Sequence, residues 1–285
     1  MDALTRIDSW PVETAAVAVL RRDGDPSGRG SVRVTTVGTR GPDRHVFPLA
    51  SVTKPLVAYA ALLAVEEGAF ELDDPAGPEG STIRHLLAHT SGLAFAGRRT
   101  LAPPGTRRIY SNTGFDVLGA ALATATGMSV ADYLAEAVTA PLGMGDTRLL
   151  DSPASGAVST VADLRLFGGD VGGPCGVARA RGGAAPGGAL PGVAGVRRGY
   201  GLADPNDWGL GFEIRGRKNP HWTGATSDPS TFGHFGRSGT FLWVDPVLGA
   251  ACVALSDRDF GDWSITAWPP FTDAVLADLR RPVPA

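Results

Sequence analysis

The sequence predicts a mixed α/β (α+β) fold, in which both ends of the chain build one antiparallel sheet around a mostly helical middle. Val- and Thr-rich alternation marks the first 40 residues and returns after Trp208, whereas the segment between carries helix-period patterns. Hydrophobic residues make up 43% of the 285 residues, which is enough for a sizeable core. We expect one domain, with a sheet lobe at about residues 1–55 and 205–285, a helical lobe at about 56–204, and a cleft between them.

The N-terminal elements follow from local signals. Segments 13–20 and 31–39 alternate like strands, and the Gly-, Asp- and Pro-rich stretch between them predicts a hairpin. Residues 51–70 read as a helix with Gly68 near its end, because Pro55 is tolerated in a first turn. Further helices are predicted at residues 82–89, 113–126, 130–140 and 159–167.

The C-terminal third begins with a compositional break. Residues 168–201 hold 13 glycines, which predicts a long irregular loop. Strands are expected at 210–214, 240–244 and 250–255, followed by a helix at 273–280.

Charge and composition exclude several classes of function. The formal net charge is −3, so no basic excess is available to bind nucleic acid. The longest apolar run covers residues 56–65, too short for a membrane span, and the N-terminus lacks the apolar core of a secretion signal. We therefore expect a soluble cytoplasmic protein. Cys175 and Cys252 allow one disulfide at most, and whether they are free stays open.

The first candidate for chemistry is Ser51-Val52-Thr53-Lys54 at the start of the first strong helix. Residues three apart lie on one helix face, so the lysine amine can reach the serine hydroxyl. A desolvated lysine can lose its proton near neutral pH and act as a base, which arginine cannot do. Because 24 of the 26 basic residues are arginine, a lysine here is informative. The alternative is a serine cap followed by a surface lysine.

Two more motifs follow along the chain. Tyr110-Ser111-Asn112 places a phenol and an amide on one short loop, where the tyrosine can relay a proton and the asparagine can orient a carbonyl. His234-Phe235-Gly236 precedes a clear strand, and a glycine on an edge strand lets a substrate approach the backbone closely. The alternative for Tyr110 is a ring packed beneath a loop.

Together these motifs resemble the serine β-lactamase and penicillin-binding-protein superfamily, and more closely its class C, esterase and D-aminopeptidase branch. Ser51–Lys54 is similar to S-x-x-K, Tyr110–Asn112 to Y-x-N, and residues 234–236 to K-T-G or H-x-G. The segments L-L-A-H-T-S-G-L at 86–93, L-D-D-P at 72–75 and W-G-L-G-F at 208–212 also resemble that branch. The resemblance covers about residues 13–278 and implies the β-lactamase/transpeptidase-like fold.

The resemblance implies acyl transfer through a serine ester, without cofactor or metal. Ser51 would be the nucleophile, Lys54 its base and Tyr110 a partner in proton transfer. Asn112 would hold the acyl side, and His234 would stand where the third motif places a cation. Backbone N–H groups of Ser51 and Arg237, the residue after Gly236, would form the oxyanion hole. The expected partner is a small-molecule acyl substrate.

Departures from the family pattern shape the choice of substrate. Phe235 replaces the threonine whose hydroxyl would bind a substrate carboxylate, although Arg237 can substitute for it. An apolar side chain there suits an ester or amide with a hydrophobic part, so a carboxylesterase-type activity is the first hypothesis. A β-lactamase, D,D-peptidase or D-aminopeptidase is the alternative within enzymes, and acyl transfer to an acceptor other than water stays open. A non-catalytic binding protein on the same scaffold is the alternative of another class.

A zinc site is an alternative to these hypotheses. His85 and His89 lie four residues apart on a predicted helix, but Leu86 stands where a metalloprotease has glutamate. No third ligand stands out, so we expect no metal.

Overall fold

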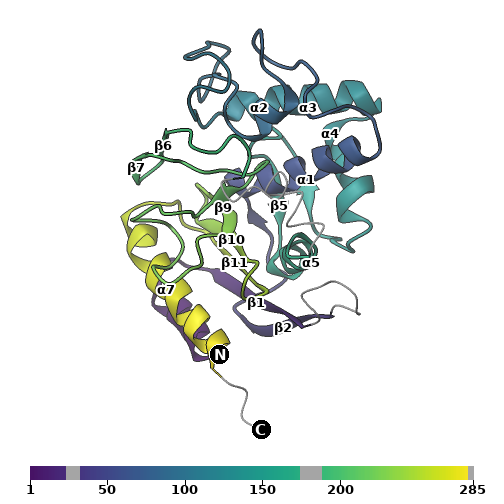
Figure 1. The fold of residues 1–285 in the computed structure, drawn as a ribbon. Coiled ribbons are helices and arrows are strands. Elements are labelled where there is room, and N and C mark those ends of the chain that lie inside the picture. Colours follow the sequence, from purple (N-terminus) through teal and green to yellow (C-terminus); the bar gives the residue numbers. More distant parts are fainter. Residues whose placement is uncertain (24–32, 174–187, 282–285) are drawn as a thin grey trace.

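The computed structural model describes residues 1–23, 33–173 and 188–281 and centres on a six-stranded sheet (Figure 1). The strand order is β2-β1-β11-β10-β9-β8, and every neighbouring pair is antiparallel. The strands are β1 (Ala15–Asp23), β2 (Arg33–Arg40), β8 (Glu213–Ile214), β9 (Phe232–Gly236), β10 (Thr240–Asp245) and β11 (Ala250–Ser256). Because β1 pairs with β11, the two ends of the chain build one sheet, as the sequence predicted.

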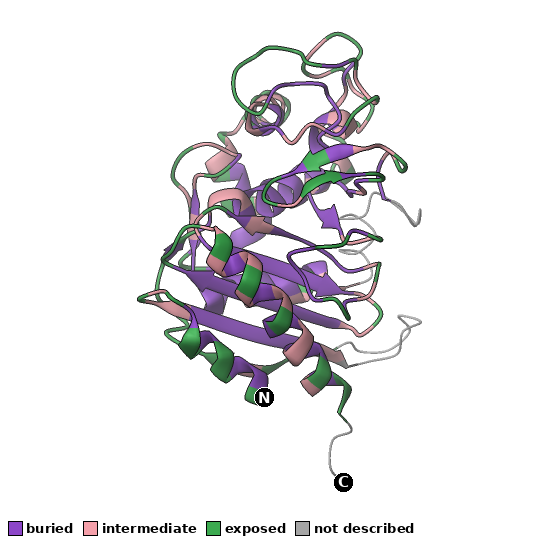
Figure 2. Ribbon diagram, turned by 90° about the vertical axis from the view of Figure 1, so that its left-hand side faces the viewer, coloured by how far each residue is buried: buried purple, intermediate pink, exposed green. Residues whose placement is uncertain are grey.

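The central strands β10 and β11 are buried along their whole length (Figure 2). Alternation along each strand divides the side chains between two covered faces. In β1, Val17 and Val19 join the core under η1 (Asp2–Ser9) and α7 (Asp262–Arg280). Ala16, Ala18 and Leu20 join the larger core with α1 (Thr53–Glu66) and α5 (Val161–Val171). This two-sided burial explains why the central strands read as continuous apolar runs.

The helical part begins and ends at recognisable caps. It contains α2 (Ile83–Leu87), α3 (Asn112–Thr126), α4 (Val130–Leu134) and the single π-helical turn η3 (Ala135–Thr139). The Ser111 side chain accepts the backbone N–H of Gly114 at the start of α3. Gly127 ends the same helix in the left-handed region, at φ 71°. The helices predicted from residues 82 to 140 are therefore confirmed with small shifts at their ends.

Small strands connect the layers. A three-stranded sheet joins β3 (Phe47–Pro48), β5 (Ala157–Ser159) and β4 (Arg148–Leu149) in that order. Its first strand, β3, lies directly before the turn η2 (Ala50–Val52), which leads into α1. Whether the chain divides into lobes at the predicted boundaries stays a prediction, since one core cluster runs from the sheet through α1 to α3.

The prediction of an irregular loop over 168–201 was wrong at both ends. Helix α5 continues through Gly168, where an added Cβ would lie 3.2 Å from Leu242 Cδ1, so the glycine lets the helix approach the sheet closely. The middle of the predicted loop, residues 174–187, lies outside the described residues. After it, β6 (Gly195–Arg197) and β7 (Gly201–Ala203) form a hairpin. Cys175 lies outside the described residues, and Cys252 is buried in β11.

Two other expectations need correction. Helix α7 begins at Asp262 instead of residue 273, although Pro269 and Pro270 lie inside it. Trp268 and Phe271 are buried against the sheet on either side of these prolines, and this packing offsets the lost backbone hydrogen bonds. The strand predicted at 210–214 is reduced to β8, because Gly211 turns the chain at φ 87°.

No single helix in the described ranges is long and apolar enough to cross a membrane. One bent pair, residues 112–126 with 130–139, meets the length and composition criteria only when its two helices are taken together.

Candidate active site

Ser51 lies in η2, immediately before α1. The preceding residue, Ala50, has φ 44°, a left-handed conformation that is unusual for a residue with a Cβ. The carbonyl oxygen of Leu49 is held by Thr240 Oγ1 at 2.9 Å and by the backbone N–H of Val52 at 3.1 Å. The strained turn is therefore fixed from both sides, and it sets the Ser51 hydroxyl at the N-terminal end of the helix.

Lys54 is fully buried one turn further on. Its Nζ donates to Asn112 Oδ1 at 2.7 Å and to the carbonyl oxygen of Ala154 at 2.8 Å, and it lies 3.4 Å from Ser51 Oγ. Burial lowers the pKa of Lys54 to about 7, and the more distant Asp116 offsets this only in part. A neutral amine has two N–H donors and one lone pair. The two strong acceptors use both donors, which leaves the lone pair for the serine hydroxyl.

Tyr110 and His234 meet on the other side of the serine. The Tyr110 hydroxyl lies 3.5 Å from His234 Nε2 and also hydrogen-bonds the Ser51 side chain. His234 Nδ1 lies 2.7 Å from the carbonyl oxygen of Phe235, which makes Nδ1 the protonated nitrogen and Nε2 an acceptor. Burial raises the pKa of Tyr110, so the group is a phenol at neutral pH.

The third motif therefore presents an uncharged ring. Burial, together with the nearby Lys54, lowers the pKa of His234 to about 3. His234 lines the cleft, but it is neutral at physiological pH, so it does not supply a cation at this position.

Gly236 brings strand β9 against the turn that carries Ser51. A Cβ at this position would lie 2.3 Å from the carbonyl oxygen of Leu49 and 3.3 Å from the Ser51 nitrogen. Strand β8 pairs with Phe232 and Gly233, at the start of β9. The glycine therefore allows β9 to contact the serine turn, and its expected role in the approach of a substrate stays a prediction.

Two other residues of this segment differ from expectation. The Arg237 side chain is exposed and pairs with Asp259 at 3.1 Å. Phe235 borders the cleft, but its ring packs against Phe260 (centroids 4.7 Å apart) and Trp268 (6.0 Å) on the α7 side of the sheet. Much of this apolar ring therefore belongs to the core between the sheet and α7.

The cleft is lined from five parts of the chain: η2, the segment before α3, the β6–β7 hairpin, the segment leading into β8, and the end of β9. Its lining residues are Ser51, Arg108, Tyr110, Val196, Arg197, Arg198, Tyr200, Asn206, Trp208, Glu213, His234, Phe235 and Arg237. Asn112 reaches the site through Lys54.

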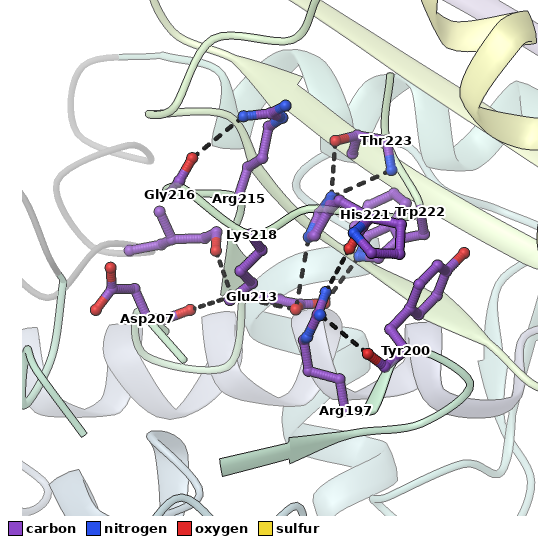
Figure 3. A network of polar contacts seen from close by, with 12 residues as sticks. Arg197, Tyr200, Asp207, Glu213, Arg215, Gly216, Lys218, His221, Trp222 and Thr223 are labelled. Atoms are coloured by element: carbon purple, nitrogen blue, oxygen red, sulfur yellow. Dashed lines mark hydrogen bonds and ion pairs between the residues drawn. The ribbon is translucent and has the colours of Figure 1, made fainter. Parts of the chain in front are cut away.

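A buried charge cluster that no sequence motif predicted lies at the wall of this cleft (Figure 3). Glu213 Oε1 lies 3.1 Å from Lys218 Nζ and 3.5 Å from His221 Nε2, and Glu213 Oε2 accepts from Trp222 Nε1 at 2.8 Å. Burial alone would raise the pKa of Glu213, but Lys218 and His221 outweigh it and hold the pKa well below its usual range. Lys218 is the second of two lysines in an arginine-rich chain, so the signal that singled out Lys54 also marks this residue.

His85 and His89, the two candidate zinc ligands, have separate structural roles. His85 Nδ1 accepts the backbone N–H of Thr82 at the start of α2, and His89 Nδ1 accepts the backbone N–H of Ser111. Within the part of the chain that the structure describes, no group of three or more His, Cys, Asp or Glu side chains is arranged to hold a metal ion.

Comparisons with known proteins agree with this geometry. The family model described as Beta-lactamase matches residues 12–276. A β-lactamase from Mycobacterium bovis has a solved structure with a TM-score of 0.88 and 51% sequence identity, covering 98% of this chain and 100% of that one.

Two curated relatives match over shorter stretches. Esterase EstB of Burkholderia gladioli is 35% identical over 180 aligned positions, and the match covers 46% of this chain and 46% of that protein. Penicillin-binding protein 4* of Bacillus subtilis is 34% identical over 137 aligned positions, and the match covers 36% of this chain and 30% of that protein. The matches thus span less than half of these curated relatives. From the match across residues 12–276 and the full-length structural similarity, we conclude that this chain belongs to the β-lactamase family of serine hydrolases.

Proposed function

We propose that this protein is a carboxylesterase-type serine hydrolase, which cleaves small esters through an acyl-enzyme on Ser51. The observation that carries the proposal is the state of Lys54. Its amine is fully buried, its pKa is about 7, and its two strong hydrogen bonds go to carbonyl-type oxygens. These features, together with Ser51 Oγ at 3.4 Å and no carboxylate at ion-pair distance among the described residues, support the role of a general base.

The reaction has two halves. Lys54 takes the proton of Ser51 Oγ while that oxygen attacks the ester carbonyl carbon. The tetrahedral intermediate then collapses, its carbon–oxygen bond to the alcohol breaks, and the proton passes to the leaving oxygen. Water next attacks the acyl-enzyme with the same base, which releases the acid and restores Ser51.

Tyr110 and the backbone assist both halves. The Tyr110 phenol hydrogen-bonds Ser51, and it is the group that carries the proton between Lys54 and the leaving oxygen. The developing oxyanion is stabilised by the N–H groups of Ser51 and Arg237, on the serine turn and just after β9. The Asn112 amide nitrogen remains to hold the acyl group, since its oxygen is bound to Lys54.

The third motif itself does not provide the contacts that a penicillin carboxylate would need. His234 is neutral and Phe235 has no hydroxyl, so this motif offers neither a charge nor a hydroxyl to the carboxylate of a penicillin. EstB, a protein described as an esterase, is among the relatives.

A β-lactamase or D,D-peptidase is the second candidate. It is supported by the 51% identity to the M. bovis protein, which is described as a β-lactamase. Both candidates require the same acyl-enzyme, so one experiment separates them.

The test is intact-mass spectrometry after exposure to 4-nitrophenyl butyrate, a penicillin and a fluorophosphonate, each applied to the wild type and to Ser51→Ala. We expect a butyryl or phosphonyl adduct on the wild type that is absent from Ser51→Ala. Turnover of the ester with no turnover of the penicillin supports the esterase, and the reverse supports the lactamase.

The control is Ser9→Ala, which removes an exposed hydroxyl in η1 far along the chain from the cleft motifs. It should form adducts as the wild type does. A folded wild type that takes no adduct from any reagent would overturn the proposal in favour of a binding protein.

A further inference from the structure

One side of the cleft carries polar side chains that the proposed reaction does not use. We call it the hairpin wall; it consists of Arg197, Arg198, Tyr200, Asn206, Trp208 and Glu213. The backbone N–H of Arg108 donates to the carbonyl oxygen of Ala194 at 2.9 Å, and this bond ties the hairpin to the segment that bears Tyr110. The wall therefore has a fixed position beside the reacting groups.

Several buried polar atoms of this wall lack partners. Within the described chain, Arg197 Nε, Asn206 Oδ1 and Trp208 Nε1 make no hydrogen bond. Their side chains are 9%, 2% and 5% exposed, and all three line the cleft. Buried polar groups in native proteins are nearly always satisfied, so a cluster of exceptions at a cleft indicates a place where a ligand supplies the partners.

The charges of the wall decide which ligand. Glu213 is compensated by Lys218 at 3.1 Å (Figure 3). The terminal nitrogens of Arg197 donate to carbonyl oxygens only, those of Pro220 at 2.7 Å and Tyr200 at 3.1 Å. Among the described residues, no carboxylate lies within ion-pair distance of Arg197 or Arg198. Burial lowers the pKa of Arg197 and the charge of Glu213 opposes this from a longer distance, so within the described chain the two guanidinium groups at the cleft have no directly bound anion.

We propose that the hairpin wall is a subsite for a carboxylate carried by the substrate, bound by Arg197 and Arg198. The proposal rests on the proposed esterase function and narrows it to acidic esters. Arginine suits this role because its planar fork matches a carboxylate and its charge is permanent. The site is close to the chemistry, since the charge of Arg198 acts on the Tyr110 hydroxyl in the same cleft.

Matched pairs of esters test the proposal. One pair is 4-nitrophenyl butyrate and mono-4-nitrophenyl succinate, which differ by a carboxylate on the acyl side. The other is phenyl butyrate, which has no carboxylate, and 4-(butyryloxy)benzoate, which carries one on the alcohol side. We expect kcat/KM to favour the acidic member of one pair about tenfold or more, as a charge-assisted hydrogen bond predicts. The favoured pair identifies the side that the wall reads.

Variants connect the preference to the wall. Arg198→Gln and Arg197→Lys should each reduce the acidic-over-neutral ratio of kcat/KM by about tenfold. Arg217→Gln removes the same charge from an exposed arginine that does not line the cleft, and it should keep the ratio. A wild-type ratio near one for both pairs, or a ratio unaffected by both wall variants, would overturn the subsite. Preferential cleavage of the cationic ester butyrylcholine would assign the wall to Glu213 and also overturn it.

A binding measurement keeps the subsite testable if the esterase proposal fails. Benzoate should slow fluorophosphonate labelling of Ser51, or raise the Tm where no labelling occurs, and its neutral isostere benzamide should do neither. Arg198→Gln should abolish this difference. Equal effects of benzoate and benzamide on the wild type would contradict the subsite, whatever the catalytic activity.

Discussion

The protonation state of Lys54 controls the reactivity of Ser51 in the proposed mechanism. Below a pKa of about 7 the amine carries a third proton and has no lone pair for the serine hydroxyl. We therefore expect kcat/KM for a neutral ester to fall about tenfold per pH unit below pH 7 and to level off above it. His234, with a pKa of about 3, adds no inflection in this range. A pH–rate profile that stays flat down to pH 5 would exclude Lys54 as the base.

Arginine at position 54 separates the charge of Lys54 from its basicity. Lys54→Arg keeps the positive charge but remains protonated at every accessible pH. We expect the rate of fluorophosphonate labelling to fall at least a hundredfold, the usual effect of losing a general base. Circular dichroism should show whether the larger group leaves the fold intact. Labelling at the wild-type rate in a folded variant would contradict the neutral-amine mechanism.

At the scale of elements, the turn at residues 151–156 supports Lys54 from outside the cleft. Ser152 Oγ donates to Asp116 Oδ1 at 2.6 Å and accepts the backbone N–H of Ala154 at 3.0 Å. The carbonyl oxygen of Ala154 then accepts from Lys54 Nζ. Asn112 and Asp116 are one helical turn apart on α3. Asn112 holds the Lys54 amine directly, and Asp116 holds it through the turn at residues 151–156.

Two variants divide this support into charge and geometry. Asp116→Asn keeps an acceptor for Ser152 but removes a charge that raises the pKa of Lys54, so the acid limb of the profile should move to lower pH by about half a unit or less. Ser152→Ala removes the hydrogen bonds and keeps the charge, so it should lower the plateau of kcat/KM several-fold without moving the midpoint. Identical pH midpoints in the wild type and Asp116→Asn would refute the electrostatic part.

Strand β9 makes a similarly specific prediction. In Gly236→Ala, the added methyl would meet the Leu49 carbonyl oxygen at 2.3 Å and Thr240 Oγ1 at 2.4 Å, so β9 must move away from the serine turn. We expect acylation to slow about a hundredfold or more, since the proposed oxyanion donors, the N–H groups of Ser51 and Arg237, lie on these two segments. Gly233→Ala meets the Leu242 carbonyl oxygen at 2.1 Å and disturbs the pairing of β9 with β10 elsewhere. Equal losses in both variants would indicate general damage to the strand.

Elements fixed by local signals could be predicted from the sequence, and those fixed by packing could not. Helix α3 lies within a residue of its expected position because a serine cap and a glycine terminate it. Helix α7 extends across two prolines because its buried aromatic residues pack on the sheet, and no local pattern records that contact. The β6–β7 hairpin was not predicted either, because its glycines indicate a loop and no local pattern records the pairing of its strands.

The active site divides in the same way at the scale of the whole molecule. Ser51, Tyr110 and His234 were predicted as site residues because each stands in a short motif, and the fold brings their segments together across more than 180 residues. The Glu213–Lys218 pair and the buried Arg197, whose Nε makes no hydrogen bond, were not predicted, because burial and contacts depend on tertiary packing. The neutrality of His234 also follows from burial, so the motif predicted its place but not its charge.

The buried Lys54 should also make the stability of the whole fold depend on pH. In the unfolded chain its pKa is the ordinary 10.5, and in the folded chain it is about 7. Between these values the unfolded state binds more protons, so the free energy of unfolding increases as the pH rises. This contribution of Lys54 to stability is lost as the pH falls toward 7. Lys54→Met removes this titration. We expect the wild type to gain about 2 to 3 kcal/mol over Lys54→Met between pH 6 and pH 9, measured by urea denaturation. Ser51→Ala retains the amine and should follow the wild type, whereas a difference between wild type and Lys54→Met that is constant with pH would mean that Lys54 keeps its proton in the folded protein.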